Sequence, residues 1–158
     1  MTTLTAKEIL GKALGKVASG IYILTTGTGE NKTGMLASWV VQAGFEPPMV
    51  TVAVGKDRDI LKTLGDNPRF VLNVLSESNS NLMGRFSKYK PEQFDGLEIF
   101  ESTQGPVLRE TVAYLSCEVK HNWTGGDHNI LLAEIVEGEI LNDDLTPWTH
   151  LRKNGFVY

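Results

Sequence analysis

The segment from Gly34 to Pro48, GMLASWVVQAGFEPP, concentrates residues with very small side chains. These residues are Gly34, Ala37, Ser38, Ala43 and Gly44. A backbone so thinly covered can be approached by a large, flat ligand, to which it presents N–H donors. The same composition is typical of a bulged, twisted strand at a barrel corner, where small residues relieve crowding. The segment therefore predicts either a surface for a planar ring or a packing arrangement within the protein.

Positive charge gathers in a second segment, the K-D-R run from Lys56 to Arg58. A helix is predicted to start near Asp59, directly after this run, and a helix N-terminus attracts anions. Lys56 and Arg58 are therefore candidates for binding a phosphate, although a K-D-R run is by default a solvated turn. Arg85 supplies another cationic candidate from a different part of the chain.

Familiar nucleotide-binding loops do not fit the sequence. In YILTTGTGENKTG, the third glycine of a dinucleotide-binding G-x-G-x-x-G would fall on Lys32, and no helix is predicted to follow. Lys32 and Thr33 resemble the end of a phosphate loop, G-x-x-x-x-G-K-[ST], but Asn31 stands where that motif has glycine. We interpret this segment as a hairpin turn. A nicotinamide nucleotide, if the protein uses one, is therefore not held in a Rossmann cleft.

Metal-binding and hydrolytic patterns are missing as well. His121, His128 and His150 are scattered, without the spacing of a zinc or di-iron site. None of the serines stands in G-x-S-x-G, which argues against a nucleophilic hydrolase. Cys117 is the single cysteine, so it has no second cysteine with which to build a metal site or a disulfide. No metal is predicted.

Composition places the chain among ordinary globular proteins. Hydrophobic residues make up 41% and charged residues 22% of the 158 residues, which suits a single domain spanning residues 1–158. The net charge of -4 and the absence of a long basic run argue against nucleic-acid binding. The apolar runs are far shorter than the roughly 20 residues of a membrane span. With one cysteine and no signal-peptide pattern, we expect a cytoplasmic location.

The pattern of the chain predicts a mainly β protein with a few short helices. A capping box at Thr5 and Glu8 begins an opening helix. The predicted strands are residues 19–27, 35–43, 48–56, 69–76 and 96–102, followed by two long strands within 111–141. A helix is predicted near residues 59–65, with one or two short helices in 78–94. TGGDH (residues 124–128) predicts the turn between the long strands. This order indicates an antiparallel Greek-key β-barrel, in which Cys117 is a buried filler.

Four segments together resemble the flavin reductase-like family of FMN-binding split barrels. They are GMLASWVVQAGFEPPMVTVAVGKDRD, RFVLNVL, GRF and GDHNILLAEIVEGEI, and they occur in the family's order between about Leu10 and Leu141. The family pattern has a glycine followed by a T-A-S-like run and a D-P-P-like strand entry, and a G-D-H hairpin near the end. PWTHLRKNGFVY further resembles the tail of the flavin reductase domains fused to cyanobacterial flavodiiron proteins. The narrower match implies that the chain is one domain of a longer enzyme.

The resemblance implies a split barrel that binds FMN, or FAD, and accepts hydride from NAD(P)H. Backbone N–H groups in the small-residue segment would meet the polar edge of the isoalloxazine ring, and cationic residues would hold the phosphate. The implied cofactor-binding residues are Met35, Leu36, Ala37, Ser38, Trp39, Gln42, Ala43, Lys56, Arg58, Asn73, Arg85 and Phe86. Asn73 is a polar residue in an apolar strand, which either the flavin or the backbone would satisfy.

His128 is the catalytic candidate, because the matching histidine of the family faces the flavin where nicotinamide stacks. Asp127 would orient its loop. The chain departs from the family at Leu36, where threonine is common, and at Gly44, where serine is common. These departures favour the main alternative, a flavin-binding electron-relay or assembly module with little reductase activity. A related barrel that uses pyridoxine phosphate or haem is a third hypothesis. The resemblance also implies a homodimer and a fused or docked flavodiiron core that reduces oxygen to water.

Overall fold

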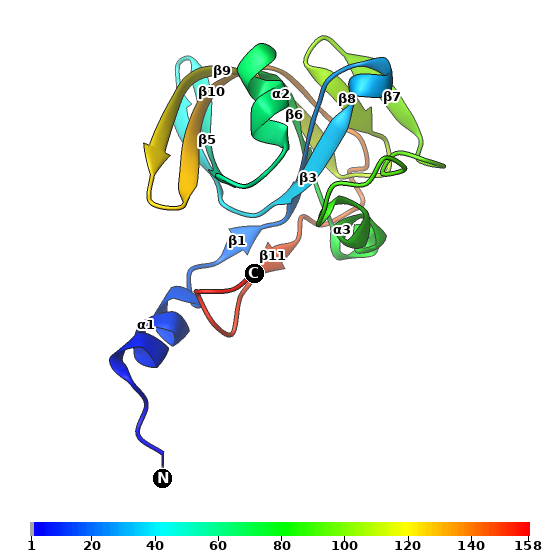
Figure 1. Ribbon diagram of the computed structural model, residues 1–158. Helices are drawn as coiled ribbons and strands as arrows, with labels where there is room; N and C mark the ends of the chain where they lie inside the picture. The colour runs from blue at the N-terminus through cyan, green and yellow to red at the C-terminus, as the bar shows by residue number, and fades with distance from the viewer. Residues whose placement is uncertain (1) are drawn as a thin grey trace.

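A curved, antiparallel, seven-stranded sheet forms the body of the protein in the computed structural model, which describes residues 2–158 (Figure 1). Its strand order is β3-β2-β6-β9-β10-β5-β4. The bounds are β2 Tyr22–Thr26, β3 Thr33–Ala37, β4 Val40–Phe45, β5 Pro48–Gly55, β6 Arg69–Val74, β9 Ala113–Gly125 and β10 His128–Ile140. The sheet curls so that β3, at one end, lies close to β5 near the other. The predicted antiparallel split barrel is confirmed.

The predicted strand over residues 35–43 is two strands. Ala37 at the end of β3 pairs with Tyr22 of β2, whereas Val40 at the start of β4 pairs with Val52 of β5. The chain therefore crosses from one end of the sheet to the other between these positions, and Trp39 accepts a backbone hydrogen bond from Ala53 on the way (3.0 Å). Because both strands read as one apolar run, the sequence pattern concealed the break.

The predicted long hairpin is present, with its turn at Gly126 and Asp127 between β9 and β10. Gly126 has φ +52, a left-handed conformation that glycine adopts without strain and that suits the first position of a tight hairpin turn. The predicted strand over residues 19–27 divides into β1 (Ser19–Gly20) and β2. A small sheet pairs β7 (Ile99–Ser102) with β8 (Gly105–Leu108), a strand that the sequence analysis did not predict.

The interior of the barrel is closed by α2 (Ile60–Asp66). Its Ile60 and Leu64 are buried against core residues such as Val52 and Phe70. Asp59 occupies the N-cap position, as predicted for Asp57 or Asp59, but its side chain makes no capping hydrogen bond. Cys117 is fully buried in the same cluster, which confirms its predicted role as a filler.

A second apolar cluster lies under α3 (Asn81–Phe86), which packs against β3 and β2. Phe86 is fully buried there, with its ring edge against Phe94 at a centroid distance of 5.3 Å. A Cβ added to Gly34 would come within 2.8 Å of the Phe86 ring. Gly34 therefore has no side chain because Phe86 occupies the space. The 3-10 turns η1 (Gly29–Asn31) and η2 (Glu77–Asn79) complete the loops.

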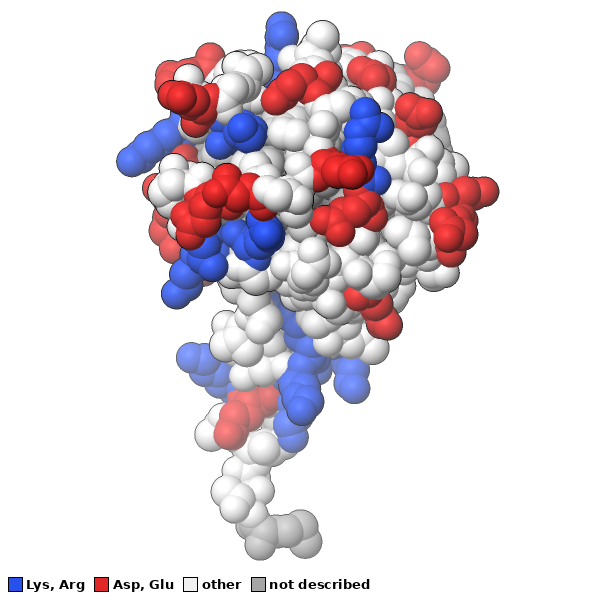
Figure 2. All heavy atoms as spheres, turned by 90° about the vertical axis from the view of Figure 1, so that its right-hand side faces the viewer, with Lys and Arg blue, Asp and Glu red and all other residues white. Residues whose placement is uncertain are grey.

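An arm projects from the barrel (Figure 1). It combines α1 (Ala6–Leu14), which has the predicted capping box, with the pair β1–β11 (Thr149–His150) and residues 151–158. The backbone N–H of Gly155 donates to Gly11 of α1 (2.7 Å), so the two ends of the chain pack together. On the face shown in Figure 2, Lys and Arg gather where the arm meets the barrel. Among residues 2–158, no helix combines the length and the hydropathy of a membrane span.

Candidate functional site

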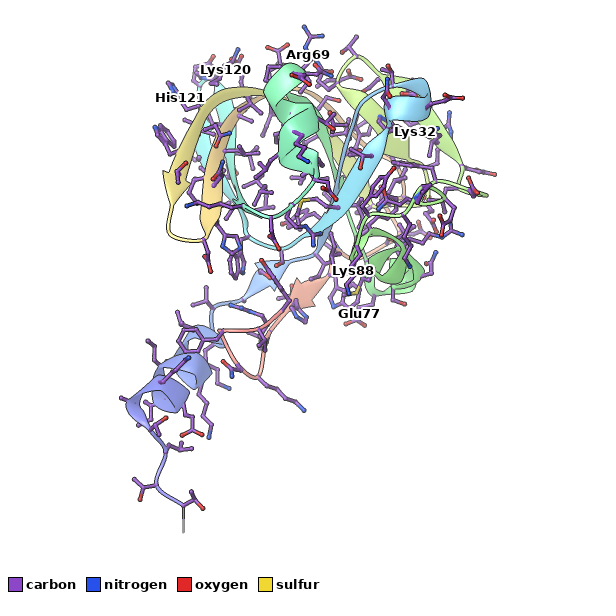
Figure 3. All side chains as sticks on the ribbon, viewed as in Figure 1. Lys32, Arg69, Glu77, Lys88, Lys120 and His121 are labelled. Carbon is purple, nitrogen blue, oxygen red and sulfur yellow. The ribbon has the colours of Figure 1, made fainter. Side chains whose placement is uncertain are left out.

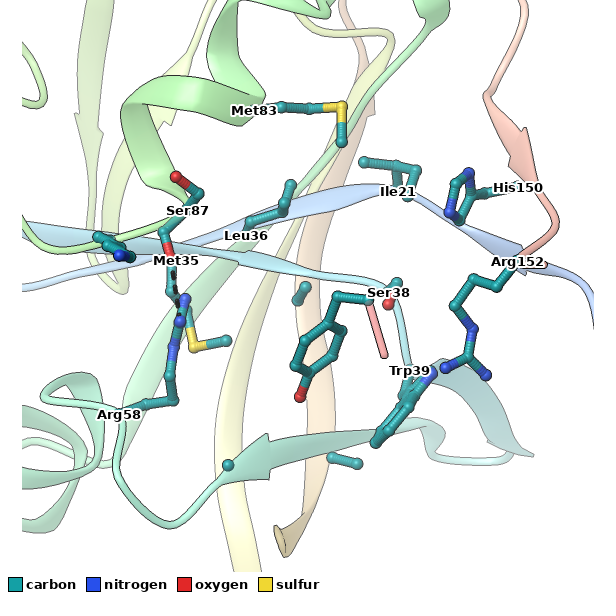
Figure 4. Close-up of a pocket in the computed structure, with 15 residues that line it drawn as sticks. Ile21, Met35, Leu36, Ser38, Trp39, Arg58, Met83, Ser87, His150 and Arg152 are labelled. Carbon is teal, nitrogen blue, oxygen red and sulfur yellow. Dashed lines mark hydrogen bonds between the residues drawn. The ribbon is translucent and has the colours of Figure 1, made fainter. Parts of the chain in front are cut away.

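A cavity of about 350 Å³ lies where β3, the end of β5, the residues after α3 and the arm meet (Figure 4). Most of its surface is apolar, and the charged residues stand toward its ends. Its lining residues are Ile21, Met35, Leu36, Ala37, Ser38, Trp39, Ala53, Gly55, Arg58, Met83, Ser87, Lys88, His150, Arg152 and Tyr158.

One wall of the cavity is the free edge of β3. Among the residues that the structure describes, this strand pairs only with β2, so every second residue directs its backbone groups away from the sheet. Gly34 shows which residues these are, because its N–H and its carbonyl contact the side chain of Gln93 rather than β2. Leu36 has the same orientation by the two-residue period, and Ser38 follows it beyond the end of the strand. Both residues line the cavity, so their N–H groups are the backbone donors best placed to meet a ligand.

The two explanations for the small residues apply to different positions. Gly34 makes room for Phe86, and a Cβ on Gly44 would lie 3.0 Å from the side chain of Met49, so these glycines serve packing. Ala37 and Ser38 instead line the cavity, opposite another small residue, Ala53 of β5. Small side chains on both walls leave a slot between the two ends of the sheet.

Cations stand at both ends of the slot. Arg58 and Lys88 lie at one end, where Nη1 of Arg58 donates to the carbonyl of Ser87 (3.0 Å). Both residues also line an adjoining cavity of about 240 Å³. Arg152 lies at the opposite end, with its guanidinium 5.3 Å from the centre of the Trp39 ring (Figure 4). The cavity thus combines an apolar middle with positive charge at each end.

His128 stands at the rim, at the start of β10. Its ring lies 4.7 Å from that of Trp39, and its Nδ1 lies 2.7 Å from a carboxylate oxygen of Asp127. This hydrogen bond is the main reason that the pKa of Asp127 is lowered from its ordinary value. On the other side of the ring, Nε2 of His128 lies 2.7 Å from the hydroxyl of Tyr158. Asp127 thus contacts the His128 ring directly, whereas the sequence analysis expected it to orient the loop.

Six of the predicted residues line the cavity: Met35, Leu36, Ala37, Ser38, Trp39 and Arg58. Gln42 and Ala43 do not, because they lie exposed on β4, where the side-chain amide of Gln42 donates to the carbonyl of Gly44. Lys56 is also exposed outside the cavity lining, and its backbone N–H joins the end of β5 to Asp127 (3.0 Å).

The remaining predicted residues are engaged within the protein. Asn73 is fully buried and donates to the carbonyl of Ile23 and the hydroxyl of Thr25, while it accepts from the N–H of Leu108. The sequence analysis predicted either the flavin or the backbone as the partner of Asn73. In the structure the backbone of Ile23 and Leu108 and the side chain of Thr25 make these contacts. Phe86 is a core residue. Arg85 donates to the carbonyls of Gln93 and Asp95 and lies outside the cavity lining.

Several cavity residues escaped the sequence analysis. Lys88 is the second residue after the GRF segment (residues 84–86), and it lies near α3 in Figure 3. Arg152 and Tyr158 belong to PWTHLRKNGFVY, a segment for which the sequence predicted no role in the site. By contrast His121, also labelled in Figure 3, stacks on Trp123 at the surface of β9 (5.1 Å). Within residues 2–158, no three His, Cys, Asp or Glu side chains are grouped closely enough to hold a metal.

The family model described as "Flavin reductase like domain" matches residues 14–156. Diflavin flavoprotein A 1 of Synechocystis sp. is 41% identical in an alignment of 154 residues that covers 94% of this chain but 27% of that protein. The chain thus spans about a quarter of the length of this relative.

Solved structures agree on the fold. The NADH:FAD oxidoreductase of Streptomyces globisporus C-1027, in complex with NAD and FAD fragments, has a TM-score of 0.83 and 25% identity, covering 95% of this chain and 92% of its own. The styrene monooxygenase flavin reductase of Pseudomonas putida S12 has a TM-score of 0.77 and 23% identity, covering 89% and 90%. A family match over nearly the whole chain, a flavodiiron-type relative and the shared split barrel lead to one conclusion: this chain belongs to the flavin reductase-like domain family.

Proposed function

We propose that this protein is an NAD(P)H-dependent flavin reductase domain whose cavity binds FMN. The observation that carries the proposal is the free edge of β3, which faces an apolar slot with cations at both ends. An isoalloxazine ring is planar and has one edge of carbonyl oxygens and ring nitrogens. The N–H groups of Leu36 and Ser38 match that edge, and the small side chains of Ala37 and Ala53 leave room for the ring.

The phosphate of FMN fits the end formed by Arg58 and Lys88. An arginine side chain donates well-directed hydrogen bonds to phosphate oxygens, and charge-assisted bonds are the stronger kind. Arg58 is held in place by the hydrogen bond that its Nη1 donates to the Ser87 carbonyl. This bond does not use the other two guanidinium nitrogens, which can donate to a phosphate. Lys88, which is exposed, adds a second positive charge beside it.

Bound flavin would supply the redox chemistry, accepting hydride from the nicotinamide nucleotide. The residues of this chain would supply position. Trp39 and His128 form an aromatic rim at the mouth of the slot, and Asp127 keeps the His128 ring oriented. Nε2 of His128 is then directed toward the entering nucleotide, where it can contact the carboxamide. Hydride transfer needs no general acid, so this arrangement is sufficient when it holds the reacting atoms about 3–3.5 Å apart.

A flavin-binding relay or assembly module is the second candidate. Its support is Leu36, because a leucine side chain lines the cavity where the family commonly has a threonine hydroxyl. Gly44, the other departure, lies on β4 outside the cavity lining and contacts Met49. Only the Leu36 departure therefore bears on the site, and the backbone N–H of Leu36 survives it. This balance favours the enzyme.

Rapid mixing separates the two candidates. The FMN-loaded protein is mixed without oxygen with NADH and, separately, with NADPH, and the flavin absorbance is followed. A reductase bleaches the flavin at a rate that rises and saturates with nucleotide concentration. Bound FMN that is not bleached by either nucleotide would support the relay instead. An absorption spectrum of the purified protein distinguishes flavin from pyridoxine phosphate and haem beforehand.

The assembly is part of the proposal. Because the chain spans about a quarter of its diflavin flavoprotein relative, we propose that it works fused to, or docked on, a flavodiiron core that receives the electrons. We also propose a homodimer, since the projecting arm exposes Ile9, Val17 and Phe156. Light scattering during gel filtration measures the mass. A monomer at micromolar concentration would contradict the dimer.

A further inference from the structure

The segment 151–158 is folded into a closed loop against the cavity. Arg152 closes it, because its Nη1 donates to the carbonyls of Gly155 and Val157 (both 3.2 Å). The backbone N–H of Arg152 donates to Gly15 at the end of α1 (3.2 Å). These bonds hold the loop to the arm and bring the next residue, Tyr158, to the cavity.

Tyr158 extends from this loop into the lining of the cavity. Its ring centre lies 5.5 Å from that of Trp39, and its hydroxyl lies 2.7 Å from Nε2 of His128. These are the aromatic rim and the nitrogen atom that the proposed function assigns to the nicotinamide ring and its carboxamide. Nε2 has one hydrogen-bonding direction in the plane of the ring, so Tyr158 and a carboxamide cannot both use it.

We propose that Tyr158 is a gate that occupies the nicotinamide position and lowers the affinity for the nucleotide until it is displaced. This inference rests on the proposed function. A phenol resembles nicotinamide in size, as a six-membered aromatic ring with one polar group, and here it has the same neighbours. Tyr158 is therefore a determinant of nucleotide affinity, placed where the lining of the cavity meets the aromatic rim.

The contacts of Tyr158 suit a gate that opens. The residue keeps 81% of its surface exposed, so few contacts hold the ring and little apolar surface is uncovered when it leaves. The closed loop behind it stays anchored through Arg152 and Gly155. The Tyr158 ring can therefore leave the cavity while these bonds are kept. A protein that binds a ligand only in its open state shows an affinity reduced by the open fraction.

Three variants test the gate. Tyr158→Ala removes the ring, and Tyr158→Phe keeps the ring but removes the hydroxyl that contacts His128. Val157→Ala is the matched control, because Val157 is an exposed side chain of the same segment outside the cavity lining. Each protein is loaded with FMN, and the rate of flavin bleaching is measured against NADH concentration. The curve gives the dissociation constant of NADH and the limiting rate separately.

We expect Tyr158→Ala to tighten NADH binding by roughly fivefold to fiftyfold, as expected if the gate is closed most of the time. Tyr158→Phe should give an intermediate value, Val157→Ala should match the unchanged protein, and the limiting rate should stay within about twofold. An unchanged or weaker NADH affinity in Tyr158→Ala, with FMN affinity intact, would overturn the gate alone. FMN affinity is titrated separately by flavin fluorescence. An unchanged protein that binds no FMN would overturn both the gate and the proposed function.

Discussion

Asp127 and His128 are adjacent in the sequence, and the Asp127 carboxylate lies 2.7 Å from Nδ1 of its neighbour. The contact orients the imidazole so that Nε2 points into the mouth of the cavity. Asp127 is otherwise exposed, and the hydrogen bond from His128 lowers its pKa, so the carboxylate stays ionised throughout the neutral range. The turn after β9 thus delivers a positioned ring to the rim of the site.

The first prediction concerns this pair. Asp127→Ala frees the His128 ring to rotate, so we expect the dissociation constant of the nucleotide to rise about threefold to tenfold, the usual range for a lost hydrogen bond. FMN affinity should not change. Rapid-mixing titrations measure both. A parallel loss of FMN affinity would show that the turn supports the flavin site instead.

The second prediction tests whether Arg58 binds the FMN phosphate, with Arg85 as the control. Arg58→Ala should weaken binding of FMN by about tenfold or more, because a charge-assisted hydrogen bond is worth about 1.5–3 kcal/mol. Riboflavin, which lacks the phosphate, should bind Arg58→Ala nearly as well as the unchanged protein. Arg85→Ala is the control, since Arg85 serves the carbonyls of Gln93 and Asp95.

Fluorescence titration gives the ratio of FMN to riboflavin affinity for each variant. The ratio cancels any general loss of structure, which lowers both affinities. A fall in the ratio for Arg85→Ala, with none for Arg58→Ala, would place the phosphate at the other arginine.

The third prediction tests the slot. Ala53 lies on the cavity-facing side of β5, opposite the wall formed by β3, and is not a core residue. Ala53→Leu should fill the slot and weaken FMN binding by about fivefold or more, because overpacking typically costs about 1–3 kcal/mol. Thr51→Leu is the control, two residues earlier on the same face but outside the cavity lining. Both variants should keep the unfolding midpoint within a few degrees, by thermal melting. Unchanged FMN affinity in Ala53→Leu would place the flavin elsewhere.

Regular features of the fold were predictable because they depend on neighbours in the sequence. The capping box of α1 and the hairpin at Gly126 are local signals, and both are present. The break after Ala37 was not predictable, because Ala37 and Val40 pair with strands at opposite ends of the sheet. The residue types in this run do not indicate which strand each residue will pair with.

The sequence predicted cavity-lining residues correctly where they are neighbours in one segment. It did not predict them where the direction of a side chain determines whether it faces the cavity or the core. Residues 35–39 line the cavity as the small-residue segment suggests. Asn73 and Phe86 are residue types that can contact a flavin, but both face the interior. There Asn73 hydrogen-bonds to Ile23, and Phe86 packs against Phe94. Arg152 and Tyr158 reach the cavity only through the fold of the arm, more than a hundred residues from the wall they face.

The last prediction concerns stability at Tyr114 and Glu137, which do not line the cavity. The hydroxyl of Tyr114 donates to the Glu137 carboxylate (2.7 Å), and this bond, followed by burial, raises the pKa of Tyr114 to about 12. Tyr114→Phe should lower the free energy of unfolding at pH 8 by about 0.5–1.5 kcal/mol. The exposed Tyr89, changed to Phe, is the control.

The pH dependence has a definite sign. The folded pKa of Tyr114 exceeds the unfolded value near 10, so its stabilising contribution is complete below pH 10 and is lost as the pH rises toward 12. The difference in unfolding free energy between the unchanged protein and Tyr114→Phe should therefore shrink above pH 10 and vanish before pH 12. Urea unfolding at several pH values measures it, and comparing the two proteins cancels the titration of the lysines. A difference that stays constant from pH 8 to 11.5 would show that the hydroxyl contributes by packing and not by its bond to Glu137.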